Sequence, residues 1–426
     1  MASGGGCAES ICDWHTLTIC EYDKLYVRHT RNLKKKIISE KDASYLQQIV
    51  IDNSPIFTFG NRCLVAQKWV GVVALPDYTI EILPKIFDEA SVEKSRDVLV
   101  RMLLVAHLST NIRQMPASLS MKKHSLMEML IETFLVELQT YVDSGLQHDY
   151  KKVSQNIKKV KGKILFNQHI NRNAWNPTHF YCRYSSYQED TELNQFFKAC
   201  LLCMAVATND MRNKKKIDEL LPAFYYVSSI TREEALNLNI EFTPINIRAE
   251  EAFKYGSMFL ENIYATLNAG ATKIYSMLFD MNLLYETFIY RAALTAFGNR
   301  VTYQRKAGYV VSRDADAKRF ICMRPDLTVK ANDGTEIIID TKWKIPNKFA
   351  KESDIYQMNA YSTSSNKVSK VVLLYPHLDS TEKMVGKYTF LLGNGHARAL
   401  EIKTIDITKV LTWNGFLKDL RTVINE

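Results

Sequence analysis

Residues 324–342 read RPDLTVKANDGTEIIIDTK, in which two apolar runs flank a short polar turn. The runs Leu327–Lys330 and Ile337–Thr341 predict two strands, and the Asn-Asp-Gly at 332–334 predicts a three-residue hairpin loop between them. With this loop, Asp326 lies directly opposite Asp340 across the strand pair. A two-residue loop would instead pair Asp326 with Thr341 and put the two acids on opposite faces of the sheet.

Two carboxylates about 5 Å apart across a sheet repel each other, so a sheet normally avoids that arrangement. A divalent cation between Asp326 and Asp340 would turn the repulsion into a pair of oxygen ligands. Side chains alternate along a strand, so Lys342 lies on the same face as Asp340. Two oxygen ligands beside an ammonium are typical of metal-assisted phosphodiester hydrolysis. The alternative is that Asp340 is an ordinary charged residue at a strand end. However, an acid that follows three isoleucines costs free energy to bury, so it is expected there only if it has a function.

The flanking segments predict an α/β fold around these strands. A helix over residues 355–361 follows them and puts Gln357 and Tyr361 on one face at i, i+4, where both side chains can support a site. A strand over 371–375 comes next, and a helix over 281–297 precedes the pair. This alternation predicts a mixed sheet flanked by helices. Glu286 on the first helix has the apolar neighbours Leu283, Tyr285 and Ile289, so it either faces the sheet or is a solvated side chain.

The rest of the chain divides into two further parts. Residues 1–95 carry short β-type runs such as Trp69–Ala74 and Thr79–Leu83, which predict a small β-rich domain. Residues 96–269 predict helices around a basic stretch, with a helix start at Thr231 and Glu234. Residues 270–426 hold the predicted mixed sheet, which makes this an α/β, multi-domain chain with three domains.

Composition limits the class of protein. The chain has 426 residues with 46% hydrophobic and 24% charged residues, which excludes disordered and fibrous proteins. Residues 1–6 lack the apolar stretch of a signal peptide, and the longest apolar run, Ala199–Ala207, is too short to span a bilayer. We therefore expect a cytoplasmic protein without membrane contact. Cys200 and Cys203 lie in that run without a second ligand pair, so we expect core residues rather than a zinc site.

Five short motifs in this order resemble the McrC family, the nuclease subunits of McrBC-type restriction systems, within the PD-(D/E)xK nuclease superfamily. They are Val160-Lys161-Gly162-Lys163-Ile164, Met281-Asn282-Leu283-Leu284-Tyr285, the Pro-Asp and Asp-x-Lys strands, Tyr356-Gln357-Met358 and Leu374-Tyr375-Pro376-His377. The resemblance extends from about residue 97 to the end. It implies a C-terminal PD-(D/E)xK sheet and an endonuclease subunit of a GTP-dependent complex that cuts double-stranded DNA with Mg²⁺ or Mn²⁺.

The resemblance also implies roles for single residues. Asp326, Asp340 and the Thr341 carbonyl would bind metal, with Glu286 as a further candidate, while Lys342, Gln357 and Tyr361 would complete the catalytic set. It implies an McrB-like AAA+ GTPase hexamer as partner, and this chain has no P-loop motif of its own.

The middle region is expected to dock to that ring and stimulate its GTPase. Residues 151–172 hold seven Lys and Arg and no Asp or Glu, which makes Lys163 and Arg172 candidates for the stimulating groups. A solvated basic face or a DNA-contacting stretch is the alternative. Two other functions stay open for the whole chain, a stand-alone RecB-like repair nuclease and a non-catalytic adaptor that activates a GTPase ring.

Overall fold

The computed structural model describes residues 16–51, 53–75, 77–85, 92–107, 126–267, 273–314, 318–344, 349–391 and 398–425. The first residues, on which the expected absence of a signal peptide depends, and the expected boundary near Gly270 lie outside these ranges. The chain groups into two compact units, one of residues up to Leu126 together with those from Ile263 onward, and one of Met127–Asn262. The three-domain division drawn from the sequence stays a prediction.

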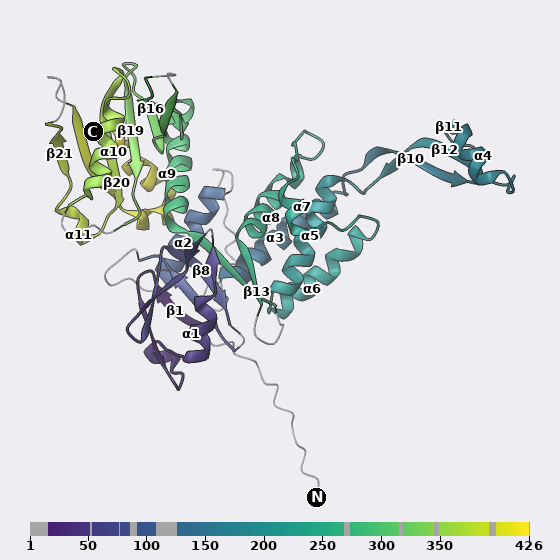
Figure 1. The fold of residues 1–426 in the computed structure, drawn as a ribbon, viewed down its shortest axis with the longest axis horizontal. Helices are drawn as coiled ribbons and strands as arrows, with labels where there is room; N and C mark the ends of the chain where they lie inside the picture. The colour runs from purple at the N-terminus through teal and green to yellow at the C-terminus, as the bar shows by residue number, and fades with distance from the viewer. Residues whose placement is uncertain are drawn as a thin grey trace, which may run out of the picture. The chain divides into compact units, whose positions relative to one another are not determined.

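A six-stranded mixed sheet forms the core of the C-terminal part of the first unit (Figure 1). Its order is β15-β18-β19-β20-β22-β21, and β19, β20 and β22 run parallel to one another. The strands are β15 (Val301–Tyr303), β18 (Leu327–Lys330), β19 (Glu336–Thr341), β20 (Val368–Pro376), β21 (Gly386–Thr389) and β22 (Ala399–Ile405). The three isoleucines form the middle of the buried strand β19, because a strand covered on both faces needs apolar residues on each.

The expected hairpin register is confirmed. In the β18–β19 pair Leu327 lies opposite Ile339 and Val329 opposite Ile337. The loop closes through the Ala331 N–H, which donates to the Thr335 carbonyl at 2.9 Å, while Gly334 adopts a φ of 84°. This is the three-residue loop and not the two-residue alternative, so Asp326 and Asp340 stay on the same side of the sheet.

Helices cover both faces of this sheet. On one face, α10 (Glu352–Ser362) packs Met358 and Tyr361 against Ile338, Val371 and other residues of the parallel strands. Ile338 and Asp340 share that face because side chains alternate along β19. On the other side, α9 (Met281–Phe297) packs against α12 (Trp413–Asn425), with the Phe288 and Phe416 ring centres 5.1 Å apart.

A second sheet in the same unit has the order β1-β9-β8-β14-β13. Its strands are β1 (Thr16–Cys20), β8 (Trp69–Ala74), β9 (Thr79–Leu83), β13 (Ile263–Leu267) and β14 (Lys273–Asp280). The β-rich character expected for the N-terminal part is thus present, and two strands from far along the chain extend its sheet. Gly71 permits this pairing, since it has a φ of 129° and a Cβ atom there would lie 2.1 Å from the Met277 carbonyl oxygen.

β14 leads directly into α9, the helix that carries Glu286. Asp280 caps this helix by accepting a hydrogen bond from the Asn282 N–H at 2.9 Å, and its second oxygen pairs with Lys68 Nζ at 2.6 Å. The remaining elements of this part are α1 (Glu40–Gln47), α2 (Val92–His107), α11 (Asp379–Glu382), β2 (Lys24–Arg28), β3 (Ile37–Ser39), β4 (Val50–Ile51), β5 (Ser54–Pro55), β6 (Phe57–Gly60) and β7 (Cys63–Ala66).

The second unit is a helical body with a long β arm (Figure 1). Its helices are α3 (Leu126–Asp143), α5 (Glu192–Ala207), α6 (Met211–Leu220), α7 (Arg232–Leu236) and α8 (Glu250–Asn262). The helix start expected at Thr231 is confirmed, because Thr231 and Glu234 form a capping box. The arm consists of β10 (Asp149–Ile157) and β12 (Phe180–Gln188), with β11 (Lys163–Ile164) and α4 (Phe166–Asn173) toward its tip. None of the described helices is both long and apolar enough to cross a membrane.

Candidate active site at the end of β19

The two predicted acids meet beside the end of the buried strand β19. Asp326 lies immediately before β18, and its Oδ2 accepts hydrogen bonds from the Thr341 N–H at 2.7 Å and the Thr341 hydroxyl at 2.8 Å. Burial, together with the nearby negative charge of Asp340, raises the pKa of Asp326 to about 6. The two carboxylates are therefore close enough for each to oppose the ionisation of the other, as the hairpin register requires.

Asp340 is fully buried and only partly compensated. Its Oδ2 is ion-paired with Lys342 Nζ, whereas Oδ1 has no hydrogen-bond partner. Burial is the main cause that raises the pKa of Asp340, and the Lys342 ammonium partly offsets it. A buried anionic oxygen that accepts no hydrogen bond is unfavourable in a protein interior unless a cation binds to it.

Lys342 connects the strand to helix α10. Burial alone would lower its pKa, but the charges of Asp340 and Asp326 outweigh this effect and raise the pKa, so the ammonium is protonated at neutral pH. Its Nζ also donates to Gln357 Oε1 at 3.3 Å. Gln357 Nε2 in turn donates to the Tyr361 hydroxyl at 3.0 Å, which donates to the Arg324 carbonyl at 3.1 Å.

The expected face of α10 is confirmed by these contacts. Gln357 and Tyr361 lie one turn apart on the side of the helix that meets the strand ends, as their i, i+4 spacing predicts. The Tyr361 hydroxyl holds the backbone just before Pro325 and Asp326. The helix therefore positions both the lysine and the segment that carries the first acid.

Glu286 approaches the same place from α9. It is half-buried, its Oε1 accepts a hydrogen bond from Gln304 Nε2 at 2.7 Å, and burial followed by the charge of Asp326 raises its pKa. Among the described residues, however, no group of three or more His, Cys, Asp or Glu is arranged to hold a metal ion. Glu286 is thus near the two acids but does not join them in a three-ligand cluster.

One acid of this site was missed in the sequence. Asp354 on α10 is buried, pairs with Lys344 Nζ at 2.5 Å, and is close enough for its charge to raise the pKa of Asp340. Its position three residues before Gln357 places it on the same helix face, and that spacing is the signal that could have found it.

The remaining predicted residues lie in the other unit. Lys163 on β11 and Arg172 on α4 are exposed on the arm, and the Arg172 guanidinium lies 4.8 Å from the centre of the Tyr181 ring. Cys200 is buried, as expected for a core residue, while Cys203 is only half-buried. No described cluster supports a zinc site at these cysteines.

Comparison with known proteins identifies the family. The family model described as McrBC 5-methylcytosine restriction system component matches residues 64–376. A chain of the Thermococcus gammatolerans half-complex of McrB AAA+ hexamers with bound McrC is 19% identical, with a TM-score of 0.64, over 96% of this chain and 100% of that one. A chain of the Thermococcus gammatolerans McrBC complex is 21% identical over 67% of this chain and 89% of that one, with a TM-score of 0.49. No curated protein matches. Since the family model covers well over half of the sequence, and the fold is that of a chain in the first complex, this protein belongs to the McrBC family of restriction system components, as the resemblance to McrC predicts.

Proposed function

We propose that this chain is the endonuclease subunit of an McrBC-like, GTP-dependent restriction complex and cuts double-stranded DNA by metal-dependent phosphodiester hydrolysis. In this proposal the mixed sheet with Asp326, Asp340 and Lys342 is a PD-(D/E)xK site, and the complex acts in the cytoplasm. The observation that carries it is the buried Asp340 carboxylate, which faces a second carboxylate and keeps one oxygen without a partner.

The donor set fits Mg²⁺ or Mn²⁺. Mg²⁺ is usually held by one or two carboxylates and several waters, so a site with two acids and no three-ligand protein cluster suits it. Asp326 and Asp340 would hold the ion, the Thr341 carbonyl would add an oxygen, and Glu286 would be a further candidate ligand. When bound, the metal neutralises phosphate charge and lowers the pKa of a coordinated water.

The remaining side chains have positioning and electrostatic roles. Thr341 fixes one Asp326 oxygen through two hydrogen bonds, which leaves the carboxylate in a single orientation. Protonated Lys342 would stabilise the charge that develops on the phosphate and orient the attacking water. Gln357 holds the lysine, and Tyr361 holds Gln357 together with the backbone at Arg324.

The arm supports the partner part of the proposal. It is a long antiparallel pair whose tip exposes basic side chains beside apolar ones, with Phe166 at 67% and Trp175 at 96% exposure. Exposed apolar residues of this size are typical of a protein interface. We propose that the arm docks to an McrB-like AAA+ GTPase hexamer, and that Lys163 and Arg172 are among the residues that stimulate its GTPase.

The test is Asp340→Asn in the reconstituted complex with the partner, GTP, Mg²⁺ and methylated DNA. Cleavage should fall by at least about a hundredfold because a metal ligand and the partner of Lys342 are weakened together. Stimulation of the partner's GTPase should persist, since the arm belongs to the other unit. Asp333→Asn in the exposed loop between the same two strands is the control and should cleave normally.

Other outcomes separate the alternatives. Full cleavage by Asp340→Asn would overturn the assigned site. Absence of cleavage by the wild-type complex, with strong GTPase stimulation, would favour a non-catalytic adaptor. Cleavage by the purified chain without partner or GTP would favour a stand-alone repair nuclease.

A further inference from the structure

A separate two-stranded hairpin precedes the site in the chain. It consists of β16 (Gly308–Ser312) and β17 (Arg319–Met323), which pair only with each other. At its base the Ala307 N–H donates to the Met323 carbonyl at 2.9 Å. None of the residues assigned above to the candidate site lies on this hairpin, although Asp326 follows its second strand by three residues.

Both ends of the hairpin are held by side chains of the candidate active site. On the incoming side, the Gln304 side chain donates to Glu286 Oε1 at 2.7 Å, and its backbone N–H donates to the Asp326 carbonyl at 3.0 Å. On the outgoing side, the Tyr361 hydroxyl donates to the Arg324 carbonyl at 3.1 Å. The position of the hairpin is therefore fixed with respect to the two acids.

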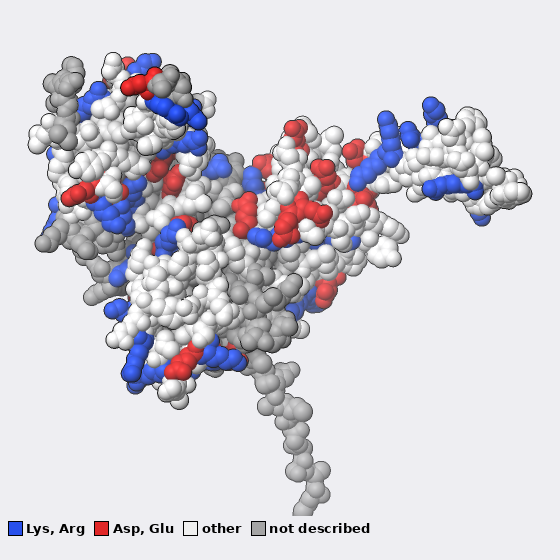
Figure 2. Space-filling model, in the orientation of Figure 1, with Lys and Arg blue, Asp and Glu red and all other residues white. Residues whose placement is uncertain are grey.

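The described part of the hairpin presents cations stacked on aromatic rings. Lys306 Nζ lies 4.4 Å from the centre of the Tyr309 ring, and the Arg319 guanidinium lies 5.9 Å from it. Arg313 and Lys318 are 5.5 and 5.7 Å from the centre of the Phe320 ring. These four basic residues and Arg324 are all exposed. Figure 2 shows Lys and Arg side chains, together with some Asp or Glu side chains, in the region where Figure 1 labels β16.

Exposed apolar side chains accompany the charges. Val310 is 49% exposed and Ile321 is 68% exposed, and the strand pairing skips both residues. Ile321 also has a φ of 57°, which a β-branched residue rarely adopts. A strained and exposed apolar residue between cations is typical of a contact surface.

We propose that the β16–β17 hairpin binds the sugar-phosphate backbone of the DNA next to the scissile phosphate, so that it holds the duplex at the carboxylate site. This inference rests on the proposed nuclease function. Five exposed cations attached to the site suit a polyanion that must cross it, and backbone contacts of this kind position a duplex without reading its sequence. A second copy of the chain is disfavoured as the occupant, because two such basic surfaces repel each other.

The experiment compares two double variants of the full chain. Lys306→Gln with Arg319→Gln removes the two charges over Tyr309, and Lys34→Gln with Lys35→Gln removes two exposed charges from the N-terminal part as a matched control. Binding to a fluorescent 30-base-pair duplex is measured in EDTA at several salt concentrations, so that no cleavage is needed. Cleavage and GTPase stimulation are then measured in the complete complex, and thermal melting verifies folding.

We expect the hairpin variant to bind the duplex about tenfold more weakly at moderate salt, with a salt dependence reduced by about two counterions, and to cleave more slowly at limiting DNA. The control should match the wild type.

If the wild-type complex cleaves and the hairpin variant binds and cleaves DNA equally well, this inference is overturned while the nuclease proposal stands. Loss of GTPase stimulation with unchanged DNA binding would overturn it in favour of a contact with the partner ring. If the wild type never cleaves but the hairpin variant still loses DNA binding, the nuclease proposal fails, the position next to a scissile phosphate is overturned with it, and only DNA binding by the hairpin is supported.

Discussion

Lys342 is the residue that joins the strand of the candidate site to its helix. It neutralises one oxygen of the buried Asp340 and donates to Gln357, which in turn is held by Tyr361. The last hydrogen bond of this series ends on the Arg324 carbonyl, two residues before Asp326. The series therefore begins at one acid and returns to the segment that carries the other, which fixes the separation of the two carboxylates.

Tyr361→Phe tests this series at its end. The substitution keeps the ring and removes the hydroxyl that accepts from Gln357 and donates to Arg324, so we expect cleavage to fall about 10- to 100-fold with little change in DNA affinity. Single-turnover cleavage by the complex measures it. Tyr356→Phe on the same helix, at a residue that is 64% exposed, is the control and should cleave like the wild type. Equal rates for both variants would show that the hydroxyl does not position the site.

Local spacing was sufficient to predict some residues and not others. The turn Asn332-Asp333-Gly334 determines the register, and helical periodicity determines that Gln357 and Tyr361 share a face, so both features follow from adjacent residues. The contact of Tyr361 with a carbonyl 37 positions earlier depends on how the helix packs on the sheet. No local pattern contains that information.

The same distinction applies to whole elements. Strands β8, β9 and β18 and helix α9 have the bounds expected from the sequence, since each has a clear apolar period and a turn or cap at its end. The arm was expected only as a basic polar stretch, because both faces of its strands are largely exposed and give no alternation. The pairing of β14 with β8 joins residues about 200 positions apart, which no window of sequence reveals.

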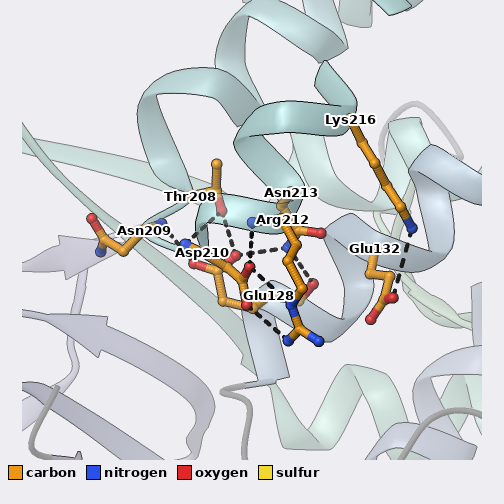
Figure 3. A network of polar contacts seen from close by, with 8 residues as sticks. All are labelled: Glu128, Glu132, Thr208, Asn209, Asp210, Arg212, Asn213 and Lys216. Atoms are coloured by element: carbon orange, nitrogen blue, oxygen red, sulfur yellow. Dashed lines mark hydrogen bonds and ion pairs between the residues drawn. The ribbon is translucent and has the colours of Figure 1, made fainter. Parts of the chain in front are cut away.

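Glu128 on α3 tests how the helices of the second unit are held together (Figure 3). This buried carboxylate accepts hydrogen bonds from the Thr208 hydroxyl, from the Asn209 N–H at 2.7 Å and from Asn213 Nδ2 at 2.9 Å, so it joins α3 to the turn before α6 and to α6 itself. Glu128→Leu would remove this acceptor from the Thr208 hydroxyl and the Asn209 N–H, while Asn213 Nδ2 keeps the backbone carbonyl of residue 128 at 3.0 Å. We expect a loss of roughly 3 kcal/mol in the free energy of unfolding.

Urea unfolding of the full chain measures this loss, and the adjacent turn of α3 supplies the control. Glu132 is 44% exposed and pairs with Lys216 at 3.7 Å, so Glu132→Leu should cost less than about 1 kcal/mol. A loss as small for Glu128→Leu as for Glu132→Leu would contradict the role of the buried network.

At the scale of the whole molecule, the net charge of +9 conceals two basic surfaces with different expected partners. One is the arm, where residues 151–172 carry seven basic and no acidic residues. The other is the β16–β17 hairpin, which is attached to the candidate site. Residues 270–426 carry 23 Lys and Arg and 16 Asp and Glu, a net charge of +7, so this part of the chain is as basic in net charge as residues 151–172. In the fold, the arm belongs to one compact unit and the hairpin to the other.

A buried hydrogen bond links the N-terminal sheet to the six-stranded mixed sheet. Trp343 follows the candidate catalytic lysine, and its Nε1 donates to Glu21 Oε2 at 2.9 Å, while the Tyr285 ring of α9 packs on the indole at 5.2 Å between ring centres. Glu21 is fully buried just after β1, and its Oε1 has no partner. Burial is the main cause that raises the pKa of Glu21 to about 8, so this carboxyl is largely protonated at neutral pH.

This raised pKa makes the stability of the first unit depend on pH. The folded protein keeps a proton on Glu21 that the unfolded chain releases above pH 4.5, so the stabilisation is complete below that pH and is lost as the pH rises through about 8. Glu21→Gln is neutral at every pH and keeps an oxygen for the Trp343 N–H. Between pH 5 and pH 8 the wild type should therefore lose roughly 3 kcal/mol more than the variant in the free energy of unfolding, as measured by urea unfolding.

The control is Asp23→Asn, at a surface ion pair two residues away, which should keep the wild-type pH dependence. Parallel pH profiles for Glu21→Gln and the wild type would mean that Glu21 is ionised in the folded protein, and that the contact between the two sheets includes a buried charge.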